Sequence, residues 1–247
     1  MKRWSLLPLL MLGCAQASDL SDLQYLSEEY RPYNYSDEQG QPTGLSVELL
    51  QAVWQRTNTR PQHITIMPWA RGYYLLTQKP NVVLFATART AAREPLFKWA
   101  CPIGYAEIVL LALKGKSPEL KSLEDAKQYP ISAVRADVGE QLLLNNGFDE
   151  GKILSANRLQ QALKMLTSGR ATLLSTNRTT VMELIHSQQL DPEQFKVAWM
   201  LSSEQFCYAF SSQVSDELVK RFQTGLNQVL ASDSYGPIRD KYFPGKQ

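Results

Sequence analysis

The sequence is poor in the side chains that bind metals. Its 247 residues include only two histidines and three cysteines. His63 and His186 stand alone, and neither a Cys-x-x-Cys pair nor a zinc-ligand spacing occurs. Two isolated histidines are typical of structural or exposed positions. The sequence therefore predicts no metal site and no cofactor.

Long apolar runs and an excess of charge are lacking as well. The apolar run at residues 6–13 is shorter than the roughly 20 residues that span a bilayer, and no later run reaches that length. Lys2 and Arg3 are the only charged residues before Ser18, so 24 basic residues face 24 acidic ones in the remaining chain. A neutral chain gives no electrostatic basis for binding nucleic acid or an anionic membrane surface.

Residues 1–17 have the three parts of a secretory signal peptide: a basic start, an apolar run and a small-residue cleavage site, Ala15-Gln-Ala17. We expect cleavage before Ser18 and export of the mature chain. Cys14 also suits a lipoprotein signal, but Met11 stands where leucine is usual, so ordinary cleavage is favoured over a lipid anchor. An uncleaved membrane anchor is the least favoured alternative.

Two cysteines, Cys101 and Cys207, remain after removal of the signal peptide. An even pair in an exported protein is compatible with a single disulfide. Two buried thiols are the alternative, and the sequence leaves both open.

Strand and helix patterns alternate along the whole mature chain. Strands are expected near residues 22–26, 64–67, 82–87, 107–114, 131–136, 152–155, 171–176, 195–200 and 206–210. Helices are expected near residues 46–56, 139–147, 159–169, 180–188 and 216–230, with another that opens at Pro68-Trp-Ala-Arg71 and a last short one after Gly236-Pro237. Ser46 is the expected N-cap of the first helix. The alternation predicts an α/β fold with parallel or mixed sheets that are covered on both faces.

Two series of strands and helices are joined through the apolar strand at 107–114, and a late strand returns to the first series. This order predicts two lobes between which the chain crosses twice. The expected boundaries are 18–104 with 206–247 for the discontinuous first lobe, and 105–205 for the second. A ligand is expected in the cleft between the lobes, at the carboxyl ends of the strands.

The segment 86–94, Ala-Thr-Ala-Arg-Thr-Ala-Ala-Arg-Glu, brings several hydrogen-bond donors close together in the sequence. It follows the apolar strand and places two hydroxyls and two guanidinium groups at the strand's carboxyl end. Donors gathered there are suited to a carboxylate or another anion. A solvated surface turn is an equally good interpretation of this segment by itself.

Several short motifs in a characteristic order carry a family resemblance. They are Tyr30-x-Pro32-Tyr33, Gly44-Leu-Ser-Val-Glu48, Pro68-Trp69, Thr90-x-x-Arg93-Glu94, Phe97 with Pro102, Gly169-Arg170, and Asp216-Glu-Leu218 to Tyr242-Phe243. Together they cover almost the whole mature chain, which resembles the periplasmic solute-binding proteins of family 3, a group that includes amino-acid binders of ATP-driven importers. The resemblance implies a type II periplasmic-binding-protein clamp with two hinge crossovers.

The resemblance also assigns ligand-binding roles in the first lobe. Arg93 matches the arginine that grips the ligand's α-carboxylate, and its planar fork suits that role better than a lysine. The alternative is an exposed arginine paired with Glu94. Tyr30 and Trp69 match positions that pack on the ligand, although packing in the core is an alternative for both. Thr90 belongs to the same motif as Arg93.

In the second lobe, Asp137 and Val138 match a helix start whose backbone N–H groups reach the carboxylate, although Asp137 also suits an N-cap. Two departures from the family pattern concern the ligand. Ala88, like Ala86, stands where amino-acid binders have small hydroxylated residues. Asn177 stands where the acid that pairs with the ligand's ammonium is expected, and an amide does not neutralise a buried charge.

These departures argue against a standard L-amino acid as the ligand. Arg71, Arg89 and Arg135 are candidates for further residues of the cleft, with ordinary surface positions as the alternative. With them, the sequence favours an anionic or neutral polar compound.

The function predicted from these residues is that of a monomeric, non-enzymatic periplasmic binder that presents a small molecule to an inner-membrane ABC permease or to a sensor. The alternative is an enzyme on the same scaffold, resembling the cyclohexadienyl or arogenate dehydratases, which needs a positioned acid in the cleft. Only Glu140 and Glu48 are weak candidates for that acid. A ligand-sensing module of a larger protein is disfavoured.

Overall fold

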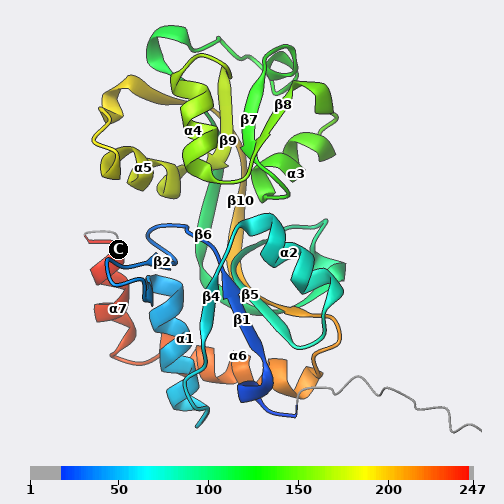
Figure 1. Ribbon diagram of the computed structural model, residues 1–247, viewed down its shortest axis with the longest axis vertical. Helices are drawn as coiled ribbons and strands as arrows, with labels where there is room; N and C mark the ends of the chain where they lie inside the picture. The colour runs from blue at the N-terminus through cyan, green and yellow to red at the C-terminus, as the bar shows by residue number, and fades with distance from the viewer. Residues whose placement is uncertain (1–17, 245–247) are drawn as a thin grey trace, which may run out of the picture.

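The chain folds into two lobes that are joined by two long strands (Figure 1). The computed structural model describes residues 18–244, so the predicted signal peptide lies outside the described residues. A single eight-stranded sheet extends through both lobes, with the strand order β4-β1-β5-β10-β6-β9-β7-β8. The sheet is mixed, because β6 and β10 pair antiparallel with their neighbours while the outer strands of each lobe pair parallel. The predicted two-lobed α/β fold is confirmed.

The first lobe holds both ends of the described chain (Figure 1). Its elements are β1 (Gln24–Ser27), β2 (Tyr35–Ser36), β3 (Pro42–Thr43), α1 (Leu45–Arg56), β4 (Ile64–Ile66), α2 (Trp69–Gln78), β5 (Val82–Arg89), the short 3-10 turn η2 (Glu94–Leu96), α6 (Asp216–Leu230) and α7 (Tyr235–Tyr242). The second lobe contains β7 (Ile131–Val134), α3 (Val138–Asn145), β8 (Ile153–Ala156), α4 (Leu159–Thr167), β9 (Leu173–Asn177) and α5 (Arg178–Ser187). The two lobes share β6 (Phe97–Leu113) and β10 (Phe195–Ser211).

The two long strands differ from the prediction in their length. The segments 195–200 and 206–210 were expected as separate strands, but they form one strand of 17 residues, β10. The polar residues between them do not end the strand, because β6 pairs with β10 from Leu113 to Phe97. These polar positions lie in the crossover between the lobes. The lobe boundaries at 104/105 and 205/206 fall within the long strands and stay a prediction.

The start of α1 also differs from the prediction. Gly44, not Ser46, is the N-cap residue, with a φ of 120°. A Cβ atom at this position would lie 2.3 Å from the Tyr33 carbonyl oxygen, so the close approach requires glycine. The first free N–H groups of the helix donate to backbone carbonyls instead of a side chain: Leu45 N to Pro32 O at 3.1 Å and Ser46 N to Tyr33 O at 2.8 Å.

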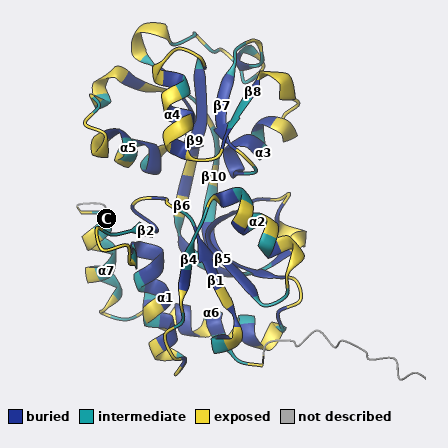
Figure 2. Cartoon of the chain, in the orientation of Figure 1, coloured by how far each residue is buried: buried dark blue, intermediate teal, exposed yellow. Residues whose placement is uncertain are grey.

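The core of each lobe lies between the sheet and the helices that cover it. Figure 2 shows buried residues along the strands and on the inward faces of the helices. In α1 the predicted apolar stripe, Leu49, Leu50, Val53 and Trp54, is buried, and it belongs to the same cluster as Phe222 of α6. Burial of each such side chain contributes about 1.5–3 kcal/mol, so these contacts fix the helices on the sheet.

None of the helices within residues 18–244 combines the length and the apolar character that crossing a membrane requires.

A disulfide joins the two long strands within the first lobe. Cys101 on β6 is bonded to Cys207 on β10, and 106 residues separate them in the sequence. Of the two alternatives that the sequence left open, the structure has the disulfide. Because the second lobe lies between these cysteines in the sequence, the bond closes a loop that contains the whole of that lobe.

We expect replacement of both cysteines, Cys101→Ser with Cys207→Ser, to lower the free energy of unfolding by about 2–5 kcal/mol, because a long cross-linked loop restricts the unfolded chain. Urea unfolding of the variant and the wild type measures the difference. The matched control is the wild type after reduction, which should unfold like the variant. Equal midpoints for oxidised wild type and variant would contradict the expected role of the bond.

Candidate functional site

Arg93 is buried between the two lobes, immediately after β5. Arg93 is only 1% exposed. The guanidinium group donates to the Ala88 carbonyl oxygen at 3.2 Å within the first lobe, and to the Ala136 carbonyl oxygen at 3.3 Å and Gln141 Oε1 at 2.8 Å in the second lobe. Arg93 therefore connects the end of β5 to the region around the start of α3.

Two aromatic rings of α2 enclose this guanidinium group. Its central carbon lies 5.2 Å from the ring centroid of Trp69 and 5.1 Å from that of Tyr73, which are cation–π distances. Trp69 is 2% exposed and its Nε1 also donates to the Ala136 carbonyl oxygen at 2.8 Å. The alternative of an exposed Arg93 paired with Glu94 is wrong, because Glu94 pairs with Arg89 at 2.5 Å.

The residues on the carboxyl side of β5 position Arg93. Ala88 is buried and supplies the carbonyl oxygen that accepts from the guanidinium group. Thr90 is also buried, and its carbonyl oxygen accepts from the Arg93 backbone N–H at 3.0 Å. These contacts turn the chain so that the arginine side chain enters the interface between the lobes.

The segment before α3 presents both a carbonyl group and a carboxylate to the interface. Asp137 is the N-cap residue of α3, and its Oδ1 accepts from the Val138 N–H at 2.6 Å. Glu140 accepts from the Ala136 N–H at 2.5 Å and from the Ser155 hydroxyl. Ala136 has a φ of 59°, a left-handed conformation that costs energy outside glycine.

The carboxyl groups of Asp137 and Glu28 act on one another from opposite lobes. Glu28 directly follows β1, and burial raises its pKa well above the usual value, with the charge of Asp137 raising it further. Burial also raises the pKa of Asp137, against the opposing effect of Arg93. Burial lowers the pKa of the Arg93 guanidinium, while Asp137 and Glu28 raise it. The interface thus concentrates two acids around one arginine.

Asn177 lies at the second-lobe side of this interface, where β9 meets α5. It is fully buried and caps α5, since its Oδ1 accepts from the Thr180 N–H at 2.9 Å. Its Nδ2, the Thr180 hydroxyl and the Tyr30 hydroxyl are buried atoms without a hydrogen-bond partner among the described residues. The cap uses the amide oxygen, so Asn177 offers a donor rather than an acceptor to a ligand.

The other arginines predicted near the cleft lie outside this buried group. Arg71 on α2 and Arg135 after β7 are exposed. Arg89 is half-buried, forms the ion pair with Glu94 and lies 3.6 Å from the Cys101 sulfur through its Nη1. The structure does not bring these three arginines together with Arg93.

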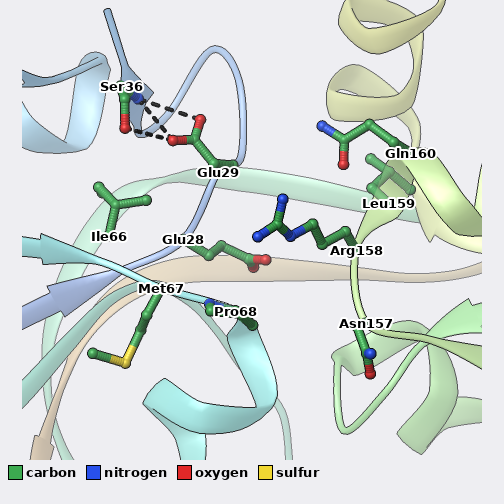
Figure 3. Close-up of a pocket in the computed structure, with 10 residues that line it drawn as sticks. All are labelled: Glu28, Glu29, Ser36, Ile66, Met67, Pro68, Asn157, Arg158, Leu159 and Gln160. Carbon is green, nitrogen blue, oxygen red and sulfur yellow. Dashed lines mark hydrogen bonds between the residues drawn. The ribbon is translucent and has the colours of Figure 1, made fainter. Parts of the chain in front are cut away.

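A cavity of about 240 Å³ opens between the lobes beside Glu28. Figure 3 shows Arg158, at the start of α4, extending across this cavity toward Glu28 from the opposite lobe. The lining residues are Glu28, Glu29, Ser36, Ile66, Met67, Pro68, Asn157, Arg158, Leu159 and Gln160. The cavity has room for a small molecule, with an acid on one wall and a base on the other.

Sequence reasoning missed several residues of this site, namely Glu28, Tyr73, Gln141, Arg158 and Thr180. A signal was present for Glu28, because the Glu28-Glu29 pair directly follows the first expected strand, where ligand-binding groups of α/β sheets gather. Gln141 had no such signal. It is one polar position on a helix, and only the approach of the second lobe brings it to Arg93.

Comparison with known proteins shows a family likeness over most of the chain. The model of the family described as bacterial extracellular solute-binding proteins, family 3, matches residues 25–245. A curated relative, the amino-acid-binding protein AabA of Dichelobacter nodosus, is 20% identical over 221 residues, which cover 88% of this chain and 86% of the relative.

Solved structures share the fold. A histidine kinase sensor domain with similarity to periplasmic binding proteins superposes with a TM-score of 0.79 at 20% identity, covering 90% of this chain and 96% of the sensor domain. The arginine-, lysine-, histidine-binding protein ArtJ from Geobacillus stearothermophilus gives a TM-score of 0.75 at 20% identity, covering 91% of this chain and 96% of ArtJ.

We expect Gly139→Ala to displace the start of α3. A Cβ atom at residue 139 would lie 2.7 Å from the Ser175 carbonyl oxygen on β9, so the first turn must move away and take Asp137 with it. The expected loss is about 1–3 kcal/mol of unfolding free energy, measured by urea unfolding. Gly115→Ala is the matched control, because its added Cβ meets no heavy atom of residues 18–244 within 4 Å, apart from the glycine and its chain neighbours. Equal stability of the two variants would contradict this packing.

Proposed function

Because this chain belongs to the bacterial extracellular solute-binding proteins of family 3, we propose that its lobes close on an amino acid or a related small compound. The observation that carries the proposal is the buried polar group between the lobes: Arg93, Asp137 and the Tyr30 hydroxyl, which has no hydrogen-bond partner in the part of the chain that the structure describes. Binding sites are typically concave, with a few polar groups that fix the orientation of the ligand. The name of the relative AabA is in accord with this class of ligand.

Closure of the lobes explains how binding becomes a signal. The hydrogen bonds from Trp69 to Ala136 and from Arg93 to Gln141 join the lobes, so they exist only when the lobes are close together. A ligand that contacts both lobes stabilises that closed arrangement by its differential affinity. A membrane partner then recognises the closed form.

The proposed partner is an inner-membrane ABC permease or a sensor, and the proposed location is the periplasm, where the protein acts as a monomer. Two similar proteins represent the two routes: ArtJ is named as a binding protein, and the histidine kinase domain is named as a sensor. The fold is common to both, so the partner has to be identified by experiment.

An enzyme on the same scaffold is the second candidate. Glu48 contacts Lys241 and Tyr242, and Glu140 binds the start of α3, so neither weak candidate acid is free for catalysis. The raised pKa values of Glu28 and Asp137, which result chiefly from burial, are the observation that favours a general acid. An NMR time course of each bound compound distinguishes the two functions, because a binder leaves the compound unchanged.

A thermal-shift screen of the purified protein tests the binding function directly. The panel contains amino acids, dicarboxylates, polyamines, sugars and aromatic acids. A compound that binds only the folded protein at a hundredfold excess over its dissociation constant adds roughly 2.7 kcal/mol of stability. A raised midpoint for one class supports the proposal, and calorimetry then gives the stoichiometry. A panel without any shift would overturn a binding function for these ligand classes.

We expect Tyr30→Phe to weaken ligand binding without destabilising the empty protein. The Tyr30 hydroxyl is buried and has no hydrogen-bond partner within residues 18–244, so its removal costs no hydrogen bond there in the absence of ligand. Loss of a bond to the ligand should reduce affinity roughly 2- to 13-fold, measured by calorimetry on a compound from the screen.

Tyr208→Phe is the matched control for this substitution. Its hydroxyl donates to the Ser46 carbonyl oxygen at 2.7 Å in the core of the first lobe. We expect this variant to lose stability and to keep its affinity. The reverse pattern in the two variants would contradict a ligand-binding role for Tyr30.

A further inference from the structure

The last helix, α7, lies on the outside of the first lobe. Figure 1 shows it beside α1, and none of its residues is buried. Its half-buried apolar residues, together with Phe243 directly after the helix, pack against the core of the first lobe. A helix without a buried residue adds little to a hydrophobic core. The contacts made by its last residues therefore matter more than its burial.

The hydroxyl group of Tyr242 lies at the start of α1. It accepts a hydrogen bond from the Gly44 N–H at 3.3 Å, lies 3.2 Å from the Thr43 hydroxyl and donates to Glu48 Oε1 at 2.5 Å. Gly44 is the N-cap residue of α1. In a capping box the side chain of the third helical residue accepts from the N-cap N–H, but here that residue is Val47. Tyr242, 198 residues away in the sequence, takes this role.

The start of α1 also holds the loop that carries Tyr30. This loop, residues 28–34, lies between β1 and β2 and contains no helix or strand, only a single bridge between Tyr30 and Asn34. The Leu45 and Ser46 N–H groups of α1 donate to carbonyl oxygens of the loop at 3.1 and 2.8 Å. A segment with few internal hydrogen bonds depends on such neighbours for its position.

Aromatic contacts form a second connection between the end of α7 and this loop. The ring centroids of Phe243 and Tyr33 are 5.4 Å apart, and those of Tyr33 and Phe206 of β10 are 4.8 Å apart. Phe206 in turn meets the Tyr30 ring edge to face at 5.9 Å. The Tyr33 hydroxyl donates to the Tyr105 carbonyl oxygen on β6 at 3.1 Å. Aromatic pairs at these distances favour defined orientations, so the neighbouring rings orient Tyr30.

The hydroxyl end of Tyr30 is directed to the interface between the lobes. Tyr30 is 5% exposed, and its hydroxyl has no hydrogen-bond partner within residues 18–244. Burial, followed by the charge of Asp137 from the second lobe, raises the pKa of this hydroxyl well above its usual value. The first lobe thus holds the ring, while the hydroxyl is left to a ligand.

Building on the proposed binding function, we propose that α7 positions Tyr30 for ligand binding, with Tyr242 and Phe243 as the positioning residues. Tyr242 fixes the start of α1, which holds the loop by its backbone. Phe243 supports the rings that orient the Tyr30 side chain. Both residues act through the loop and not on the ligand itself. The last helix of the chain therefore contributes to affinity more than to the stability of the core.

Amide hydrogen exchange of the ligand-free protein tests this role without a probe compound. We expect Tyr242→Phe to speed exchange at residues 30–34 and 44–46 roughly 2- to 13-fold, the range for loss of one hydrogen bond. Phe243→Leu keeps an apolar side chain but removes the ring, and it should act on the same two segments. Asp240→Asn is the matched control, since Asp240 is an exposed residue of the same helix, and it should leave both segments unchanged.

A purely stabilising role of α7 would give a different pattern. Lower global stability would speed exchange evenly in both lobes, including the core strands β1 and β7. An even rise of this kind, or unchanged exchange in Tyr242→Phe and Phe243→Leu, would overturn the positioning role. Urea unfolding of each variant shows that it is folded.

A double-mutant cycle tests whether α7 acts through Tyr30. Calorimetry gives the affinities of the wild type, Tyr30→Phe, Tyr242→Phe and the double variant for the amino acids and the other compounds of the screening panel. We expect Tyr242→Phe to weaken binding roughly 2- to 13-fold in the wild type and less than about 2-fold in Tyr30→Phe, because the hydroxyl that it positions is then missing. Effects that multiply would show independent action and would overturn the proposal.

The outcomes separate this proposal from the binding function on which it rests. Wild-type affinity in both Tyr242→Phe and Phe243→Leu would overturn the positioning role and leave the binding function intact. Absence of binding by every compound of the panel would overturn the binding function, and ligand positioning with it. The exchange data would still decide whether α7 holds the loop.

Discussion

The structure depends on how a buried guanidinium group is satisfied between two lobes. Arg93 is enclosed by two aromatic rings and donates to carbonyl oxygens of both lobes and to Gln141. A buried cation is stable only with such partners, and here the two acceptors of the second lobe lie 43 and 48 residues away in sequence. The arrangement couples the position of the second lobe to the end of β5. Separation of the lobes would remove acceptors that the arginine needs.

The two long strands, β6 and β10, connect the lobes covalently. β6 and β10 are paired with one another over their length and continue through both lobes, so they hold the lobes in register while the polar middle of β10 lies in the crossover. The disulfide between Cys101 and Cys207 anchors the two strands within the first lobe. Such a clamp is in accord with the solute-binding family whose model matches residues 25–245.

The sequence was most informative about helices and strands with a clear hydrophobic periodicity. It was least informative about which charged side chains lie between the lobes. The apolar stripe of α1 and the order of strands and helices were predicted correctly, because they depend on local periodicity. The N-cap at Gly44 and the unbroken β10 were missed, because backbone contacts from other segments decide both. The importance of Arg93 followed from its motif, whereas the surface arginines considered with it proved to lie elsewhere. The residues next to Arg71, Arg89 and Arg135 in the sequence do not indicate whether these side chains point into the cleft or into solvent.

By itself, the sequence determined the two-lobed α/β fold and the family. Hydrophobic periodicity and the order of the motifs can both be read from the sequence, because neither depends on contacts between distant segments. Only the tertiary structure decided which polar groups share the closed interface. Glu28 and Asp137 are more than 100 residues apart in the sequence, and neither has an unusual local setting. Their electrostatic character arises when the second lobe excludes water and brings the two carboxylates within range of Arg93. Such an effect of burial and proximity is a property of the fold, not of either segment.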